Sequence, residues 1–332
     1  MPVYLIVIFS LLGIIAAMLA AFIIYFMCSP MSVVRLIRRA GDGEYTNPPD
    51  YDEIMARVDI EKDLVYPSEF QKNNFDLYLP KAPGKHPLVL WVHGGSFVAG
   101  DKCGIENWGV MFSGNGYAAA MMNYEWAPEK PYPTQILQIT QALKAIAEIA
   151  EKNGRIDMSR IAIAGDSAGA HMASQFALIH TNSEFSKRLG IKSPLKKDAL
   201  KCALLYCGPF DLESLLNIEN KKLKFFAGRI GWSYLGQKNW RKAALNDTLT
   251  PMNFVTKDYV PSYITDGNNF SFESHGKKLG EALRKVGVKV QERYFDKEQY
   301  GEINHGYEVQ LETEPAMLCF NDTIEFLNEN MQ

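Results

Sequence analysis

The chain starts with an uncharged segment that is unsuited to a water-exposed fold. No charged side chain occurs from Pro2 to Pro30, and the apolar run from Val3 to Cys28 is longer than the about 20 residues that a helix needs to cross a bilayer. A secretory signal peptide has basic residues before an apolar run of only about 7–15 residues. Neither feature is present, so residues 1–30 are predicted to form a retained transmembrane helix.

The charges around this helix predict its orientation. Arg35, Arg38 and Arg39 follow it, whereas no basic side chain precedes it. By the positive-inside rule, the rest of the protein is expected in the cytosol. The five cysteines agree with a reducing compartment, because their number is odd and their spacing fits neither a disulfide framework nor a metal site.

The composition excludes several classes of protein. The chain has 35 Lys and Arg against 38 Asp and Glu, a net charge of −3, and 47% hydrophobic residues. A nucleic-acid-binding protein needs a broad basic surface to neutralise phosphates, so no nucleic-acid partner is expected. The chain is also too apolar to be disordered. The membrane lipid around the N-terminal helix is an expected partner, and the composition does not predict an oligomeric state.

Strand and helix patterns alternate after the membrane segment. Residues 31–60 form a juxtamembrane segment in which an amphipathic helix is followed by Gly and Pro, and residues 61–330 are the expected catalytic domain. The strands are predicted at 75–80, 87–94, 117–124, 160–165, 202–208, 262–265 and 290–295, and the main helices at 134–154, 274–287 and 314–329. This alternation predicts an α/β fold with a mostly parallel sheet covered by helices on both faces.

One region interrupts the alternation. Residues 212–259 are long, aromatic and basic, and they lie between two strands where a short helix would suffice. Such an insertion is typical of a cap over the strand ends. Its aromatic side chains either line a pocket or, in the alternative interpretation, rest with the basic residues on anionic lipid.

The motif GDSAG, from Gly165 to Gly169, predicts a nucleophile. It follows the apolar strand RIAIA and precedes the helical pattern AGAHMASQFALIH. A Gly-x-Ser-x-Gly turn between strand and helix is the nucleophile elbow, in which the glycines leave room for a sharp turn that exposes the serine. Ser167 is therefore the candidate nucleophile.

A second motif, HGGSF, predicts an oxyanion hole. It begins at His93, at the end of the strand PLVLWV, and precedes the serine motif along the chain. Backbone N–H groups of such a glycine-containing loop can bind a developing oxyanion. The expected donors are the N–H groups of Gly95, Ser96 and Ala168, with Gly94 shaping the turn.

With these motifs the sequence resembles the α/β-hydrolase fold, and in particular the hormone-sensitive-lipase-like group of carboxylesterases. The resemblance extends from about Asp63 to Asn328 and includes HGGSF, NYEWAPEKPYPTQ, DMSRIAIAGDSAGAHMA and INHGY. It implies hydrolysis of small-molecule acyl esters by a Ser–His–acid triad, without a metal or a cofactor. The group usually has a third glycine where Ser96 stands, a change that a backbone donor tolerates.

The resemblance also implies the general base. His305, in NHGY after the last strand, matches the catalytic position of the group. It would take the proton from Ser167 and return it to the leaving alcohol. His93 belongs to the oxyanion loop, and His171 lies on the helix after the elbow, so both are expected to be packing residues.

The triad acid departs from the pattern. The group usually places Asp three residues after a Gly, but here that residue after Gly267 is Phe270. Three carboxylates remain candidates. Asp266 ends a predicted strand and is preferred, Glu273 begins a predicted helix, and Asp211 follows the preceding strand, where Asp also serves as a helix cap.

The sequence thus predicts a membrane-anchored serine carboxylesterase that works through an acyl-enzyme. An amidase or acyl-peptide hydrolase is the alternative within enzymes, since the same triad cleaves amides. A non-catalytic binding module on a hydrolase fold is the alternative outside enzymes, and the displaced acid is the feature that suggests it.

Overall fold

A computed structural model of the chain describes residues 2–41 and 43–332, so Met1 and Asp42, which fall in the expected segments 1–30 and 31–60, are outside it. Helix α1 (Val3–Cys28) projects from a compact body, and none of its residues is buried. Within the described chain it is the one helix that is long and apolar enough to cross a membrane, with a mean hydropathy of 2.9. A signal sequence near an N-terminus can pass the same test of length and composition, so this test alone shows no membrane topology.

The body is built on one eight-stranded sheet with the order β1-β2-β4-β3-β5-β6-β7-β8. Strands β1 and β2, and β2 and β4, pair antiparallel, whereas the remaining neighbours are parallel. The central strands are almost completely buried, as expected for parallel strands covered on both faces. The bounds are β1 Val58–Val65, β2 Asn74–Pro80, β3 His86–Val92, β4 Ala118–Met122, β5 Ile156–Asp166, β6 Leu200–Tyr206, β7 Ser262–Asp266 and β8 Val290–Tyr294.

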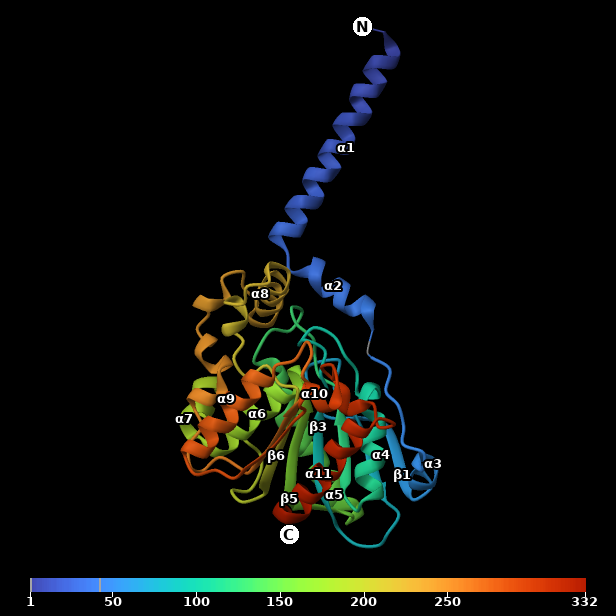
Figure 1. Ribbon diagram of the computed structural model, residues 1–332, viewed down its shortest axis with the longest axis vertical. Helices are drawn as coiled ribbons and strands as arrows, with labels where there is room; N and C mark the ends of the chain where they lie inside the picture. The colour runs from blue at the N-terminus through green and yellow to red at the C-terminus, as the bar shows by residue number, and fades with distance from the viewer. Residues whose placement is uncertain (1, 42) are drawn as a thin grey trace.

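Helices cover both faces of the sheet and divide the apolar core in two. One core cluster holds the buried side chains of α5, α6 and α9, and the other holds those of α3, α4 and α11. The predicted α/β-hydrolase arrangement, a mostly parallel sheet between two layers of helices, is confirmed (Figure 1). The bounds are α3 Tyr51–Met55, α4 Glu106–Gly114, α5 Thr134–Asn153, α6 Ala168–Thr181, α7 Ser183–Leu189, α9 Glu273–Lys285, α10 Lys297–Tyr300 and α11 Glu314–Asn330.

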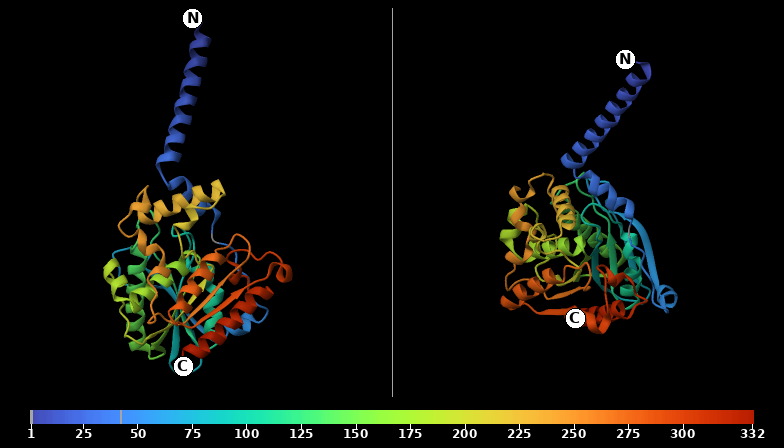
Figure 2. Two further views of the ribbon diagram at one scale, coloured as in Figure 1. Left: turned by 60° about the vertical axis from the view of Figure 1, so that its left-hand side comes forward. Right: turned by 45° about the horizontal axis from the view of Figure 1, so that its top comes forward.

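The insertion between β6 and β7 contains α8 (Lys221–Leu235) and several short 3-10 turns. It lies at the end of the body from which α1 projects, and α8 is next to the lower end of α1 in all three views (Figures 1 and 2). Among the described residues, the 3-10 turns are Lys102–Ile105, Ser214–Leu216, Trp240–Lys242, Asn246–Leu249, Pro251–Asn253 and Tyr307–Val309.

Helix α2 (Met31–Ala40) is attached to the body. Its Val33 and Val34 are buried, and the Arg38 guanidinium donates to the carbonyl oxygens of Val98 at 2.8 Å and Ala127 at 3.2 Å. The predicted juxtamembrane helix is thus part of the packed structure.

The sequence analysis did not predict β1, and the boundary expected between residues 60 and 61 falls inside it. The strand VDIEKDLV has three charged side chains in its centre, and most of its residues are exposed or half-buried. It lies at the edge of the sheet, where one side has no strand partner. An edge strand carries a weaker apolar pattern than a central one, which is why the pattern was missed.

Candidate active site

Ser167 occupies a sharp turn between β5 and α6. Its backbone has φ +51° and ψ −117°, a conformation that side chains other than glycine rarely adopt. The Ser167 N–H donates to the carbonyl oxygen of Tyr206 at 2.8 Å, which anchors the turn to β6. The turn has the geometry of a nucleophile elbow.

The two glycines of GDSAG are required by close packing. A Cβ added at Gly165 would lie 2.5 Å from the carbonyl carbon of Gly169, and one added at Gly169 would lie 1.9 Å from the carbonyl oxygen of Val92. Both obstacles are backbone atoms that cannot move aside. Any side chain at these positions would displace the helix from the sheet and with it the serine.

His305 faces the serine from the loop after β8. Its Nε2 lies 2.9 Å from Ser167 Oγ, within hydrogen-bond distance. The His305 N–H donates to the carbonyl oxygen of Asn269 at 3.1 Å, and the Phe272 ring packs edge-on against the imidazole at 5.3 Å between centroids. The backbone and the ring together fix the position of the imidazole.

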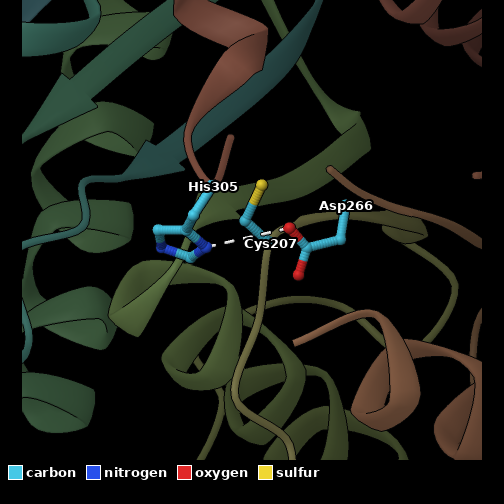
Figure 3. A group of neighbouring side chains, drawn as sticks. All are labelled: Cys207, Asp266 and His305. Atoms are coloured by element: carbon cyan, nitrogen blue, oxygen red, sulfur yellow. Dashed lines mark ion pairs between the residues drawn. The ribbon is translucent and has the colours of Figure 1, made fainter. Parts of the chain in front are cut away.

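Asp266 faces Nδ1 of the imidazole, whereas Ser167 faces Nε2, and Figure 3 shows Asp266 next to His305. Its Oδ1 is 3.7 Å from His305 Nδ1, longer than a hydrogen bond, and catalytic hydrogen bonds in ligand-free sites are often longer than in the substrate complex. The carboxylate is buried, and it accepts the N–H groups of Gly267 on Oδ1 at 2.8 Å and of Phe272 on Oδ2 at 2.7 Å. These two bonds hold the side chain at the end of β7.

The structure places the two other candidate acids elsewhere. Glu273 begins α9, as predicted, and its carboxylate pairs with Lys277 one turn along the helix. The Asp211 carboxylate accepts the N–H of Ser214 at 3.1 Å, in the manner of a cap for a short 3-10 turn. Of the three predicted carboxylates, Asp266 is the one paired with His305, and its catalytic role stays a prediction.

Two opposing effects act on the imidazole. Burial lowers the pKa of His305, but the adjacent Asp266 carboxylate, with smaller effects of Glu308 and Asp166, raises it, and the net pKa lies above 6.5. A carboxylate beside Nδ1 stabilises the imidazolium that forms when the base accepts a proton.

The loop after β3 presents the expected oxyanion donors. Gly95 and Ser96 have φ +109° and +54°, so the backbone of this loop turns sharply. Within residues 2–41 and 43–332, no acceptor is found for the N–H groups of Gly95, Ser96 and Ala168, whereas the Gly94 N–H donates to Asp166 Oδ2 at 3.0 Å. Ser96, Ser167 and Ala168 line one cavity together. Gly94 thus shapes the loop, and the other three N–H groups are available to a ligand.

The remaining histidines of the motifs are packing residues, as expected. His93 and His171 are buried, and burial lowers the pKa of each to about 4, so both are neutral at pH 7. His93 Nδ1 lies 2.7 Å from the carbonyl oxygen of Gly94, and His171 Nδ1 lies 3.0 Å from that of Pro209. Neither of these two hydrogen bonds involves Ser167.

Two cavities meet at His305. The first, about 430 Å³, extends from Ser167 under the cap and has mostly apolar walls, which include Leu215, Phe226 and Ile230. The second, about 490 Å³, lies beyond His93 and Gly94 and carries the carboxylates of Glu44, Asp101, Asp166 and Glu308. An acyl chain fits the chemistry of the first cavity, and a polar group fits that of the second.

Sequence analysis missed a buried acidic group near His305. Cys207 Sγ donates to Glu308 Oε2 at 3.1 Å, and burial, followed by the charge of Asp166, raises the pKa of Glu308 to about 7. Asp166 accepts Trp91 Nε1–H at 2.8 Å, and burial raises its pKa to about 6. No sequence pattern distinguishes these acids from exposed ones, because their burial depends on the packing of distant segments.

Cys207, Asp266 and His305 are close enough to be considered as a metal site, since one ligand atom of each lies within 4.8 Å of the others (Figure 3). The side chains fit a metal poorly. A metal needs the thiolate, whereas burial raises the pKa of Cys207 well above 9.0, and both oxygens of Asp266 already accept backbone N–H groups.

The model of the BD-FAE family matches residues 75–272 of the chain. The chain belongs to the BD-FAE family. The matched region starts in β2 and contains the HGGSF loop, the serine elbow, the cap and Asp266, and it ends before His305. The predicted resemblance to the serine esterases of the α/β-hydrolase fold is confirmed by this match.

Curated relatives of this BD-FAE protein carry the names of hydrolases. Kynurenine formamidase of Drosophila melanogaster is 25% identical over 226 residues, which cover 64% of this chain and 65% of the relative. Esterase LipQ of Mycobacterium tuberculosis is 25% identical over 235 residues, which cover 68% of this chain and 53% of the relative. The chain therefore spans less than two thirds of the length of these relatives.

Solved structures share the fold of this BD-FAE protein. Esterase B from Lactobacillus rhamnosis superposes with a TM-score of 0.74 at 20% identity, covering 95% of this chain and 96% of that one. A bacterial heroin esterase superposes with a TM-score of 0.66 at 22% identity, covering 84% and 86%. At such low identity these likenesses establish the fold alone. The names of the esterases among these relatives and structures agree with the predicted class of carboxylic ester hydrolases.

Proposed function

We propose that this BD-FAE protein is a membrane-anchored serine carboxylesterase. The observation that carries the proposal is the 2.9 Å contact between Ser167 Oγ and His305 Nε2 at a strained strand-to-helix turn. A serine alcohol is a weak nucleophile until an adjacent base accepts its proton. The strained turn exposes Ser167 Oγ, and the imidazole of His305 activates the same atom by accepting its proton.

The proposed reaction has two steps. In the first, His305 takes the Ser167 proton while Oγ attacks the ester carbonyl, and the N–H groups of Gly95, Ser96 and Ala168 bind the oxyanion. Collapse of the intermediate releases the alcohol, which receives the proton from His305. In the second step His305 activates water, which attacks the acyl-enzyme and frees the acid. Asp266 orients the imidazole and stabilises its charged form.

The apolar cavity supports an acyl ester as the substrate. Cap residues such as Leu215, Phe226 and Ile230 form its walls, and it begins at Ser167. Burial of an acyl chain against such walls is favourable by about 0.8 kcal/mol for each CH₂ group. The cavity is therefore proposed to hold the acyl part of the ester.

The membrane anchor is proposed to be α1. Its 26 residues span about 39 Å at 1.5 Å per residue, enough for the about 30 Å hydrocarbon core of a bilayer. Arg35, Arg38 and Arg39 on α2 favour a cytosolic location for the catalytic domain.

One relative favours a second candidate activity. Kynurenine formamidase is named as a hydrolase of a formamide, and it aligns with 64% of this chain. The same triad cleaves amides through the same acyl-enzyme, so hydrolysis of a small amide is the alternative.

A substrate panel and one variant test the proposal. The wild-type protein and Ser167→Ala are compared on p-nitrophenyl esters of increasing chain length and on the matching anilides, with a fluorophosphonate probe for the activated serine. Ser167→Ala is expected to lose the labelling and on the order of a millionfold in ester turnover. Retention of more than about one per cent of the turnover would show that another residue is the nucleophile. Faster cleavage of anilides than of esters would favour the amidase.

A further inference from the structure

Helix α8 connects two parts of the molecule that have been described separately, the membrane helix and the apolar cavity. Two rows of side chains run along it at helical spacing. Leu223, Phe226 and Ile230 face the cavity that starts at Ser167. Phe225, Arg229 and Trp232 form the second row, in which the Arg229 guanidinium lies 4.8 Å from the centre of the Phe225 ring and 5.1 Å from that of Trp232.

The second row holds the lower end of α1. Arg229 donates to the carbonyl oxygens of Phe26 at 3.0 Å and Met27 at 3.3 Å. These belong to the last turn of α1, where carbonyl groups have no partner within the helix and a cation is favourable. The Phe225 ring also stacks on the Phe26 ring, with 5.3 Å between centroids and 8° between planes. The cap is thus bonded to the end of the membrane helix.

The exposed side chains around this junction are basic and apolar. At the start of α8, Lys221, Lys222 and Lys224 are exposed and surround Leu223, which is 48% exposed. Within the described part of the chain, none of these lysines forms an ion pair. On α2, which contacts α8, the exposed side chains include Arg35, Arg39 and Leu36, the last 55% exposed.

These features suit the surface of an anionic bilayer. Basic side chains next to a membrane helix are attracted to anionic lipids, and apolar side chains on the same face enter the boundary between headgroups and acyl chains. The junction of α1 with α8 fixes where that surface lies, because the last turn of α1 touches both helices (Figure 2). Leu223 belongs both to this exposed face and to the wall of the cavity.

We infer that α8 and α2 rest on the anionic leaflet into which α1 is inserted, and that the acyl chain of a membrane-resident ester passes from the bilayer along α8 at Leu223 to Ser167. This inference rests on the proposed esterase function. It specifies the substrate as an ester with a long acyl chain that is dissolved in the membrane, in preference to a water-soluble ester.

The first test separates the membrane surface from the chemistry. The full chain is reconstituted in phosphatidylcholine vesicles containing phosphatidylserine, and two substrates are compared, a soluble p-nitrophenyl acetate and a bilayer-dissolved fluorogenic long-chain ester. Replacement of Lys221, Lys222 and Lys224 by Glu is expected to lower the rate on the bilayer ester at least about tenfold and to leave the rate on the acetate within about twofold of wild type.

A matched triple variant controls for the change in net charge. Lys192, Lys196 and Lys197 are also exposed. They precede the amino end of β6, whereas Ser167 follows the carboxyl end of the parallel strand β5, so the two sites lie at opposite ends of the strands. Replacement of these three lysines by Glu is expected to change neither rate. Equal loss in both triple variants, or an unchanged rate on the bilayer ester in the α8 variant, would refute the inference. Failure of the wild type to hydrolyse either ester would instead refute the proposed function.

A second measurement does not depend on catalysis. With the exposed Cys28 and Cys103 replaced by Ser, a fluorophore is attached to Lys222→Cys or to the control Lys196→Cys. In vesicles whose lipids carry brominated acyl chains, strong quenching is expected at position 222 and not at position 196. Equal quenching at both positions, or none at 222, would show that α8 does not lie on the membrane.

Discussion

Glu308 offers a quantitative test of the buried acidic group near His305. Its carboxylate accepts the Cys207 thiol at 3.1 Å and is almost fully buried. Burial raises the pKa of Glu308 from 4.5 to about 7 in the folded protein. A pKa that is higher in the folded than in the unfolded state stabilises the fold below the unfolded value, and this stabilisation is lost as the pH rises through the folded value. Glu308 therefore makes the protein less stable at pH 8 than at pH 5.

The size of the effect follows from the two pKa values. Ionisation of Glu308 costs about 3 kcal/mol more in the folded protein than in the unfolded chain. When the ionisation of Glu308 is integrated from pH 5 to pH 8, this one group lowers the free energy of unfolding by about 2.5 kcal/mol. For a protein of this size, that corresponds to a fall in Tm of about 4 °C. A neutral amide at this position removes this contribution.

The variant Glu308→Gln is therefore expected to narrow the difference in Tm between pH 5 and pH 8 by about 4 °C. Thermal unfolding followed by near-ultraviolet circular dichroism at both pH values measures the difference, and the contributions of other titrating groups cancel when variant and wild type are subtracted. Glu312→Gln, at an exposed position of the same segment, controls for the loss of one charge. An equal difference in Tm between pH 5 and pH 8 in wild type and Glu308→Gln would mean that Glu308 ionises with an ordinary pKa and that water reaches its carboxylate.

Three other results are expected. Asp266→Asn should lower kcat by about a hundredfold or more, because the amide keeps the shape of the side chain but can favour the wrong imidazole tautomer, whereas Glu273→Gln and Asp211→Asn should each lose less than about tenfold in kcat. Each variant must have an unchanged Tm. A large loss of kcat in Glu273→Gln together with a nearly normal kcat in Asp266→Asn would show that Glu273 is the triad acid. In the pH profile of kcat/KM, the midpoint of the acid limb should lie above 6.5, because activity needs neutral His305 and Asp266 raises the pKa of His305. In Asp266→Asn this midpoint should move to lower pH. A midpoint that stays in place would show that a group other than Asp266 raises the pKa of His305. A protein starting at Met31 should be soluble and still hydrolyse a short p-nitrophenyl ester, since α1 contributes no side chain to either cavity. In intact cells that express the full chain, an impermeant thiol reagent should fail to label a C-terminal cysteine, and ready labelling would place the catalytic domain outside the cell.

The sequence predicted the parts of the fold that repeat a simple pattern. The central strands are apolar throughout because both faces are covered. The helix expected over 134–154 is α5, which ends at Asn153 and is followed by Gly154 in the left-handed conformation of a helix C-cap. Although Gly169 packs against Val92 from a distant segment, the serine elbow could be predicted because its strand, its GDSAG turn and its helix follow one another directly along the chain. Such local constraints leave a direct trace in the sequence.

Features that depend on distant packing left no such trace. Asp266 could be preferred over Glu273 only by its place at a strand end, since the two backbone N–H groups that hold it come from a loop whose path the sequence does not reveal. The buried state of Glu308 needs the approach of Cys207, which directly follows β6, about 100 positions earlier in the chain. The bond from Arg229 to the end of α1 joins residues about 200 positions apart, and no periodic pattern reports such a pair.

The short connection between α1 and the body has a consequence for how the protein moves in a membrane. Only Ser29 and Pro30 separate α1 from α2, Arg229 bonds the end of α1 to the cap, and Arg38 bonds α2 to the loop that follows the oxyanion donors. A domain on a long flexible linker tumbles and spends most of its time with its active site turned away from the bilayer. In the proposed anchoring the domain would keep one orientation, so its encounters with a membrane-dissolved molecule would reduce to lateral diffusion in two dimensions.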